Sequence, residues 1–105
     1  MRIEIKKFGD ILISRQAGKE AYAAFLPTLD TIKEGELVLI DFSDVKVLTP
    51  SWADEFLTPL LDRFDNSLKL IPSDNSSIKL TIKTIEEILK KDFPICDQDE
   101  NLKNL

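Results

Sequence analysis

Residues 49–55 contain most of the side chains that could do chemistry in this chain. The hydroxyls of Thr49 and Ser51 stand on either side of Pro50. This pattern is typical of a helix start, where a hydroxyl caps free backbone N–H groups and proline is favoured at the first helical position. Two residues are alternative candidates for the cap. Either Thr49 caps a helix that begins at Pro50, or Ser51 caps and Asp54 completes a pair resembling a capping box.

The same helix start could also bind or carry an anion. Free N–H groups and a partial charge of about +0.5 make the N-terminus of a helix favourable for negative groups. A phosphate on Ser51, or alternatively on Thr49, would add about −1.5 to −2 charges, which the helix end stabilises and the acidic Asp54 and Glu55 repel. We therefore consider both hydroxyls as phosphorylation sites, beside the simpler interpretation that they only cap.

Other side chains of the segment fit binding better than catalysis. Trp52 is either a packing residue or an anchor for a partner, since tryptophan is enriched in binding hot spots. Asp54 and Glu55 are neighbours in sequence and therefore diverge by about 100° on a helix. That divergence argues against a shared general acid–base site.

The composition excludes the common catalytic and metal sites. Histidine is absent and Cys96 is the single cysteine. Triads that depend on histidine, histidine general bases and zinc sites built from histidine and cysteine cannot be formed. We therefore expect a protein that is not an enzyme and uses no cofactor or metal.

Net charge and hydropathy make some classes of partner and location unexpected. The net charge is −5, with three arginines among 105 residues. Nucleic-acid binding depends on cationic side chains that neutralise phosphates, so DNA and RNA are not expected as partners. The sequence has no apolar run of about 18 residues, so no membrane span is predicted. The lone cysteine and the charged N-terminus favour a cytoplasmic location.

A buried strand is expected to position the candidate site. Residues 37–40 (LVLI) form an uninterrupted apolar run, which is typical of a strand covered on both faces. Asp41 ends this run, and a loop with Asp44 leads to the helix start at residues 49–51. Ligands and partners collect at the carboxyl ends of strands in open α/β sheets. We therefore assign Asp41, Asp44, Thr49, Ser51, Trp52, Asp54 and Glu55 to a candidate partner-binding surface.

The rest of the chain predicts one α/β domain. Alternation in residues 2–7, a turn at residues 8–10 and an apolar triplet at residues 11–13 predict an antiparallel hairpin. A helix from Ser14 to about Lys33, kinked or broken near Pro27, a strand at residues 68–71 and a helix from Ser76 or Ser77 complete the pattern. The expected fold is a mixed four-stranded sheet with about three helices in residues 1–93, followed by a loose tail, residues 94–105.

These motifs resemble the STAS-like domain family of bacteria. The resemblance rests on residues 37–45 (LVLIDFSDV) followed by residues 48–57 (LTPSWADEFL), with the Phe8-Gly9 turn and the Ser14-Arg15 pair upstream. It covers roughly residues 1–92. The sequence departs from the related anti-sigma-factor antagonists, which usually carry a turn resembling Asp-Ser-Ser-Gly where this chain has Pro50 and Trp52.

The resemblance implies a regulatory module that binds a protein. In the related antagonists, the domain docks on a kinase-like ATPase of the GHKL type, and phosphorylation of a Ser or Thr at this helix start releases it. Ser51 occupies the matching position and Thr49 is its neighbour. The alternatives from the residues themselves are a domain that senses a small ligand or nucleotide through the same helix N-terminus, and an accessory or purely structural module.

Overall fold

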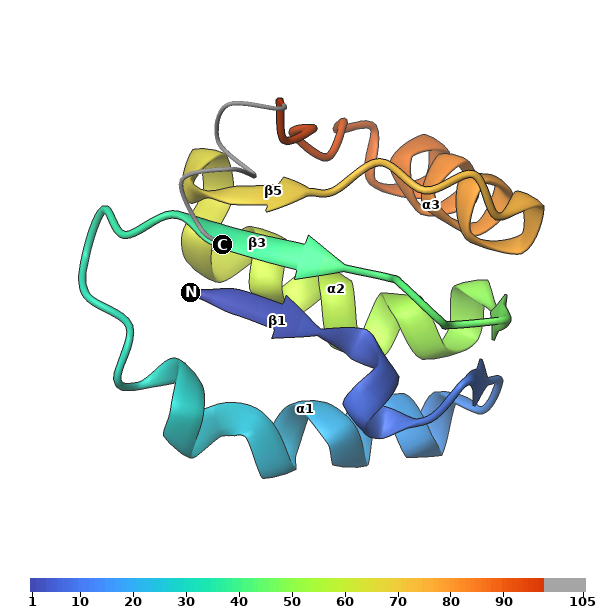
Figure 1. The fold of residues 1–105 in the computed structure, drawn as a ribbon, viewed down its shortest axis with the longest axis horizontal. Coiled ribbons are helices and arrows are strands. Elements are labelled where there is room, and N and C mark those ends of the chain that lie inside the picture. The colour runs from blue at the N-terminus through green and yellow to red at the C-terminus, as the bar shows by residue number, and fades with distance from the viewer. Residues whose placement is uncertain (98–105) are drawn as a thin grey trace.

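Three short parallel strands form the centre of the computed structural model, which describes residues 1–97 (Figure 1). They are β1 (Arg2–Glu4), β3 (Val38–Asp41) and β5 (Leu68–Leu70), in the spatial order β1-β3-β5. The register places Ile3 beside Ile40, and Ile40 beside Leu70. These side chains share one face of the sheet and belong to the hydrophobic core.

The predicted N-terminal hairpin is wrong. β1 pairs with β3, and the second N-terminal strand, β2 (Ile11–Leu12), pairs in parallel with β4 (Val47–Leu48). Between β1 and β2 the chain forms a 3₁₀ turn, η1 (Ile5–Phe8), which ends at Gly9 with φ +126°. The turn carries the chain onward instead of reversing it, and β4 follows β3 in the same direction (Figure 1). The predicted four-stranded sheet is therefore a parallel sheet of three strands and a parallel pair.

Three helices with side-chain caps complete the domain. They are α1 (Arg15–Leu29), α2 (Pro50–Phe64) and α3 (Ser76–Leu89), and a 3₁₀ turn, η2 (Asp65–Ser67), leads from α2 into β5. The caps Ser14, Thr49 and Asn75 accept hydrogen bonds from backbone N–H groups three residues on. α1 continues through Pro27 and ends at Leu29, short of the predicted end at Lys33.

The helices bury an aromatic core against the sheet. In Figure 1, α2 lies behind the sheet, with α1 along one side and α3 along the other. Phe56 has no exposed surface, and its ring lies 5.0 Å from that of Trp52 and 4.9 Å from that of Phe8. Phe25 joins the group with a ring centroid 5.6 Å from Phe8. This cluster joins η1 to α1 and to the first two turns of α2.

Part of the predicted tail packs on the domain. Pro94 O accepts a hydrogen bond from Leu70 N at 2.8 Å, and Cys96 N donates to Leu70 O at 2.8 Å. Phe93 and Cys96 are buried. The segment from Pro94 to Cys96 therefore adds a short parallel bridge to the outer edge of β5, and the remainder of the predicted tail, residues 98–105, lies outside the described residues.

Candidate functional site

The starts of α1 and α2 are joined through β2 and β4. Thr49 N donates to Leu12 O at 3.0 Å, and the Thr49 hydroxyl donates to Ile13 O at 2.5 Å. Gly18 in α1 lies directly against the backbone of α2, so that a Cβ at that position would lie 2.6 Å from Trp52 O. These contacts hold the two helix N-termini together at one edge of the molecule, which we call the helix-start edge.

The two candidate hydroxyls have different roles. Thr49 is the cap of α2: its hydroxyl accepts from Trp52 N at 3.4 Å while donating to Ile13 O. Ser51 is the second residue of the helix, so the alternative in which Ser51 caps is wrong. The Ser51 side chain is half-buried, and its hydroxyl makes no hydrogen bond to any residue within 1–97. Of the two hydroxyls, only that of Ser51 is left uncommitted by this part of the fold.

Trp52 is a core residue in this structure. Its side chain is 1% exposed, and its indole stacks on Phe56 with an angle of 25° between the ring planes. The indole therefore offers a partner almost no surface while the aromatic core stays closed. We therefore leave Trp52 out of the exposed surface, although its backbone helps to form the helix start.

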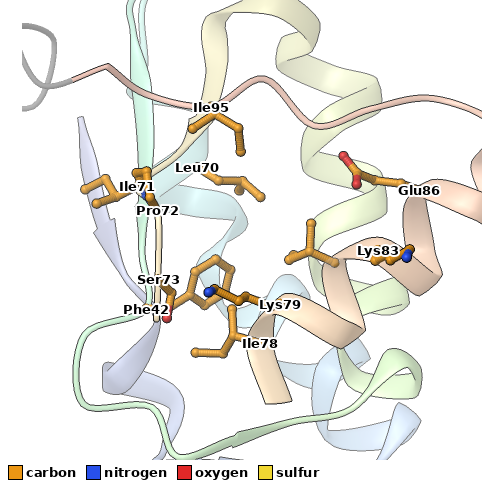
Figure 2. Close-up of a pocket in the computed structure, with 11 residues that line it drawn as sticks. Phe42, Leu70, Ile71, Pro72, Ser73, Ile78, Lys79, Lys83, Glu86 and Ile95 are labelled. Atoms are coloured by element: carbon orange, nitrogen blue, oxygen red, sulfur yellow. The ribbon is translucent and has the colours of Figure 1, made fainter. Parts of the chain in front are cut away.

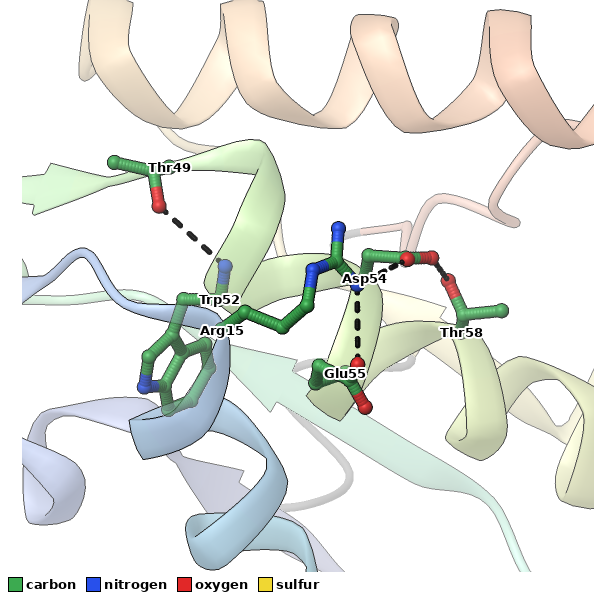
Figure 3. Close-up of polar contacts among 6 residues, drawn as sticks. All are labelled: Arg15, Thr49, Trp52, Asp54, Glu55 and Thr58. Atoms are coloured by element: carbon green, nitrogen blue, oxygen red, sulfur yellow. Dashed lines mark hydrogen bonds and ion pairs between the residues drawn. The ribbon is translucent and has the colours of Figure 1, made fainter.

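Arg15 brings the two adjacent carboxylates of α2 together. Its Nη1 donates to Asp54 Oδ2 at 2.8 Å and to Glu55 Oε1 at 3.0 Å (Figure 3). Asp54 also accepts a hydrogen bond from the Thr58 hydroxyl at 3.0 Å. The hydrogen bond from Arg15 lowers the pKa of Asp54, against a smaller opposing effect of burial. Arg15 therefore links the two carboxylates in an ion-paired bridge between α1 and α2.

Asp41 has a structural role at the end of β3. Its carboxylate is 8% exposed and accepts bonds from Arg2 Nε at 3.1 Å, Arg2 Nη2 at 3.0 Å, Ser43 N at 2.9 Å and the Ser43 hydroxyl at 2.7 Å. Burial by itself raises the pKa of Asp41, but the Ser43 hydrogen bonds and the Arg2 guanidinium outweigh it and hold that pKa below its ordinary value. Each of the two carboxylate oxygens therefore accepts two hydrogen bonds.

Asp44 lies in the following turn and is exposed, with φ +66°. Its carboxylate lies 3.4 Å from Lys6 Nζ. Together with Glu4, Asp41 and Ser43, these two residues line a small polar hollow of about 100 Å³. Neither Asp41 nor Asp44 is bonded to a residue of α2 within the described chain. The predicted surface therefore divides into this hollow and the helix-start edge.

The edge also carries two apolar side chains that the sequence interpretation missed. Ile11 is 54% exposed and Ile13 is 55% exposed. They help to line a hollow of about 460 Å³ between β2 and α1, whose floor includes Phe8 and Trp52. One signal was available: in an extended segment, residues 11 and 13 point to the face opposite Leu12, so all three are buried only if both faces of the strand are covered.

Among residues 1–97, no group of three or more His, Cys, Asp or Glu side chains is arranged to hold a metal ion. Within the same part of the chain, no helix combines the length and apolar character that crossing a membrane requires.

The comparison with protein families gives one match. The model of a STAS-like domain of unknown function matches residues 25–90, which is more than half of the chain. The chain belongs to the STAS-like domain family. The match includes α2 with Ser51 and the carboxylates of the Arg15 bridge, whereas Arg15 itself, Ile11 and Ile13 lie upstream of it. None of the curated proteins and none of the solved structures matches the chain.

Proposed function

We propose that this STAS-like domain is a non-catalytic regulatory module that binds a protein partner through the joined starts of α1 and α2. The observation that carries the proposal is the exposure of Ile11 and Ile13 beside this edge. Exposed apolar side chains that border a hollow are common features of protein-binding surfaces. Ser51, Asp54 and Glu55 provide polar groups at the start of α2.

The partner that we propose is a kinase-like ATPase of the GHKL type. The support for this partner is the membership in the STAS-like family together with the likeness to anti-sigma-factor antagonists described above. A kinase partner also gives a role to the uncommitted hydroxyl of Ser51. A phosphate there would lie at the positive end of α2 and near the carboxylates that Arg15 holds, so it would change the charge of the edge by about −1.5 to −2.

The structure favours Ser51 over Thr49 as the phosphate acceptor. The Thr49 hydroxyl caps α2 and donates to Ile13 O, and a phosphate ester has no hydroxyl hydrogen left to donate to that carbonyl. Loss of one such hydrogen bond costs about 0.5–1.5 kcal/mol. Modification of Ser51 breaks no hydrogen bond within residues 1–97. We therefore propose Ser51 as the switch residue and Thr49 as part of the framework.

The alternative of an anion or nucleotide sensor at the same helix start has less support. The hollow beside the edge is lined by apolar residues, Ser14 and Glu20, and no lysine or arginine lines it. A phosphate-bearing ligand would meet no cation there to balance its charge.

The test is recovery of a GHKL-type ATPase with the tagged chain from its native lysate. Ile13→Asp, an exposed change, should reduce recovery at least tenfold, since it places a charge in the proposed interface. Ile88→Asp is the matched control, because Ile88 is 66% exposed on α3, away from the edge. Equal recovery with Ile13→Asp and Ile88→Asp would refute the surface.

The switch is tested separately with the purified partner and ATP. Mass spectrometry should find phosphate on the wild-type chain and on Thr49→Ser, and none on Ser51→Ala. Ser51→Glu should weaken binding while Ser51→Ala retains it. Phosphate on Ser51→Ala at residue 49 would show that the acceptor is wrongly assigned, and an absence of phosphate on the wild type would leave a binding module without this switch.

A further inference from the structure

A third hollow, on the opposite side of α2 from α1, has features of a ligand site. It lies between α3 and the end of β5, with a volume of about 310 Å³ (Figure 2). Its walls are mostly aliphatic and aromatic: Phe42, Leu70, Ile71, Ile78, Ile82 and Ile95. Ile95, supplied by the segment that bridges to β5, is 56% exposed at the rim.

Two lysines on α3 form the polar part of the rim. Lys79 and Lys83 are separated by four residues and therefore lie on one face of the helix (Figure 2). Both are exposed, and within residues 1–97 neither ammonium group has an ion pair or a side-chain hydrogen bond. The one carboxylate of the lining, Glu86, is engaged by Phe93 N at 2.7 Å. The rim therefore presents two ammonium groups beside apolar walls, with one lining carboxylate, Glu86, whose negative charge the backbone N–H does not cancel.

The volume limits what can occupy the hollow. About 300 Å³ is the lower end of the range for small-molecule sites. One turn of a helix, about 10 Å wide and 5.4 Å long, occupies about 420 Å³, so a docked helix would not fit inside. An unbranched aliphatic chain fits such walls, and each CH₂ group that it buries there contributes a favourable free energy of transfer from water.

We propose that this hollow binds a medium-chain fatty acid, with the aliphatic chain against Phe42, Leu70 and Ile82 and the carboxylate beside Lys79 and Lys83. The two lysines provide point charges for the carboxylate, while the walls provide the apolar contact. The site is separate from the helix-start edge and shares no lining residue with the hollow there. Its occupancy can therefore be measured independently of partner binding.

The experiment is an NMR titration of the ¹⁵N-labelled full chain with decanoate, kept below its micelle concentration. Saturable shift changes are expected at Ile71, Ser73, residues 78–86 and Ile95. Decanol, which has the same chain without the charge, should bind at least threefold more weakly, because each exposed ion pair contributes a modest amount. Changes centred on the β2 and α1 residues, or no saturable change, would overturn the proposal.

Charge variants test the role of the lysines. Lys79→Gln combined with Lys83→Gln should bring the affinity for decanoate down to that for decanol and leave decanol binding unchanged. Lys19→Gln, an exposed lysine on α1, is the matched control and should leave both affinities at wild-type values. A double variant that binds decanoate as tightly as the wild type would refute recognition of the carboxylate.

Discussion

The contact between Gly18 and α2 predicts that Gly18→Ala lowers the free energy of unfolding. In Gly18→Ala, the new Cβ would lie 2.6 Å from Trp52 O, 3.1 Å from Trp52 Cα and 3.2 Å from Trp52 C. All three are backbone atoms inside α2, held by its helical hydrogen bonds and by the burial of the Trp52 side chain. They cannot rotate away as the end of a side chain could, so the two helices must move apart.

Two opposing effects determine the magnitude. Alanine is more favourable than glycine in a helix interior by about 1 kcal/mol. Overpacking a tight contact costs about 1–3 kcal/mol, and contact with rigid backbone belongs in the upper part of that range. We therefore expect Gly18→Ala to lower the free energy of unfolding by about 1–2 kcal/mol. Without the contact, the same substitution would raise it.

Urea unfolding measures this difference directly. Trp52 is the sole tryptophan and is buried, so its fluorescence reports the unfolding of the core. Ala24→Gly, at an exposed position of α1, provides the control for helix propensity alone, with an expected loss of about 1 kcal/mol. A Gly18→Ala chain at least as stable as the wild type would show that α1 and α2 do not touch as described.

Three further substitutions test other contacts by urea unfolding. Thr49→Ala should lose about 1–2 kcal/mol, because it removes the cap and the bond to Ile13 O, while Thr49→Ser should retain most of the stability. Asp41→Asn should cost about 1–3 kcal/mol at pH 7. Because the folded-state pKa of Asp41 is lowered, its contribution is present above the unfolded value of about 3.9 and is lost as the pH falls through the folded value, so the two chains should converge below the folded value. Arg15→Gln should cause only a small loss of stability, and 0.5 M NaCl should reduce that loss, because its ion pairs are exposed. A loss that is independent of pH for Asp41→Asn, or of salt for Arg15→Gln, would contradict the assigned role.

The sequence predicted those parts of the fold that depend on neighbouring residues. A cap at or near Ser14, a helix start at residues 49–51 and a buried strand at residues 37–40 follow from local capping chemistry and apolar runs. The structure has Ser14 as the cap of α1, α2 starting at Pro50 and β3 at Val38–Asp41. The direction of β2 does not follow from local pattern. A turn at Gly9 is compatible with reversal or continuation, and only the pairing of Ile11 with Val47, far along the chain, decides between them.

The same distinction applies to the candidate site. Helical periodicity separates Asp54 from Glu55, and this is correct for the helix alone. The structure nevertheless joins them, because Arg15 reaches both carboxylates from another helix. That partner is separated from Asp54 by 39 positions in sequence, and no pattern within residues 49–55 indicates it. The second function of Thr49, its bond to Ile13 O, depends on a long-range contact of the same kind.

The resulting division of residues 49–55 determines how experiments on this segment should be interpreted. Thr49 and Trp52 face the fold, where one joins α2 to β2 and the other fills the aromatic core. Ser51 and the Arg15-bridged carboxylates lie toward solvent. A substitution of Trp52 would therefore weaken partner binding by destabilising the whole domain, whereas Ile13→Asp and Ser51→Glu change the surface without removing a core contact. A loss of binding in those two variants, with unfolding free energies near that of the wild type, is the result that separates a binding surface from a structural segment.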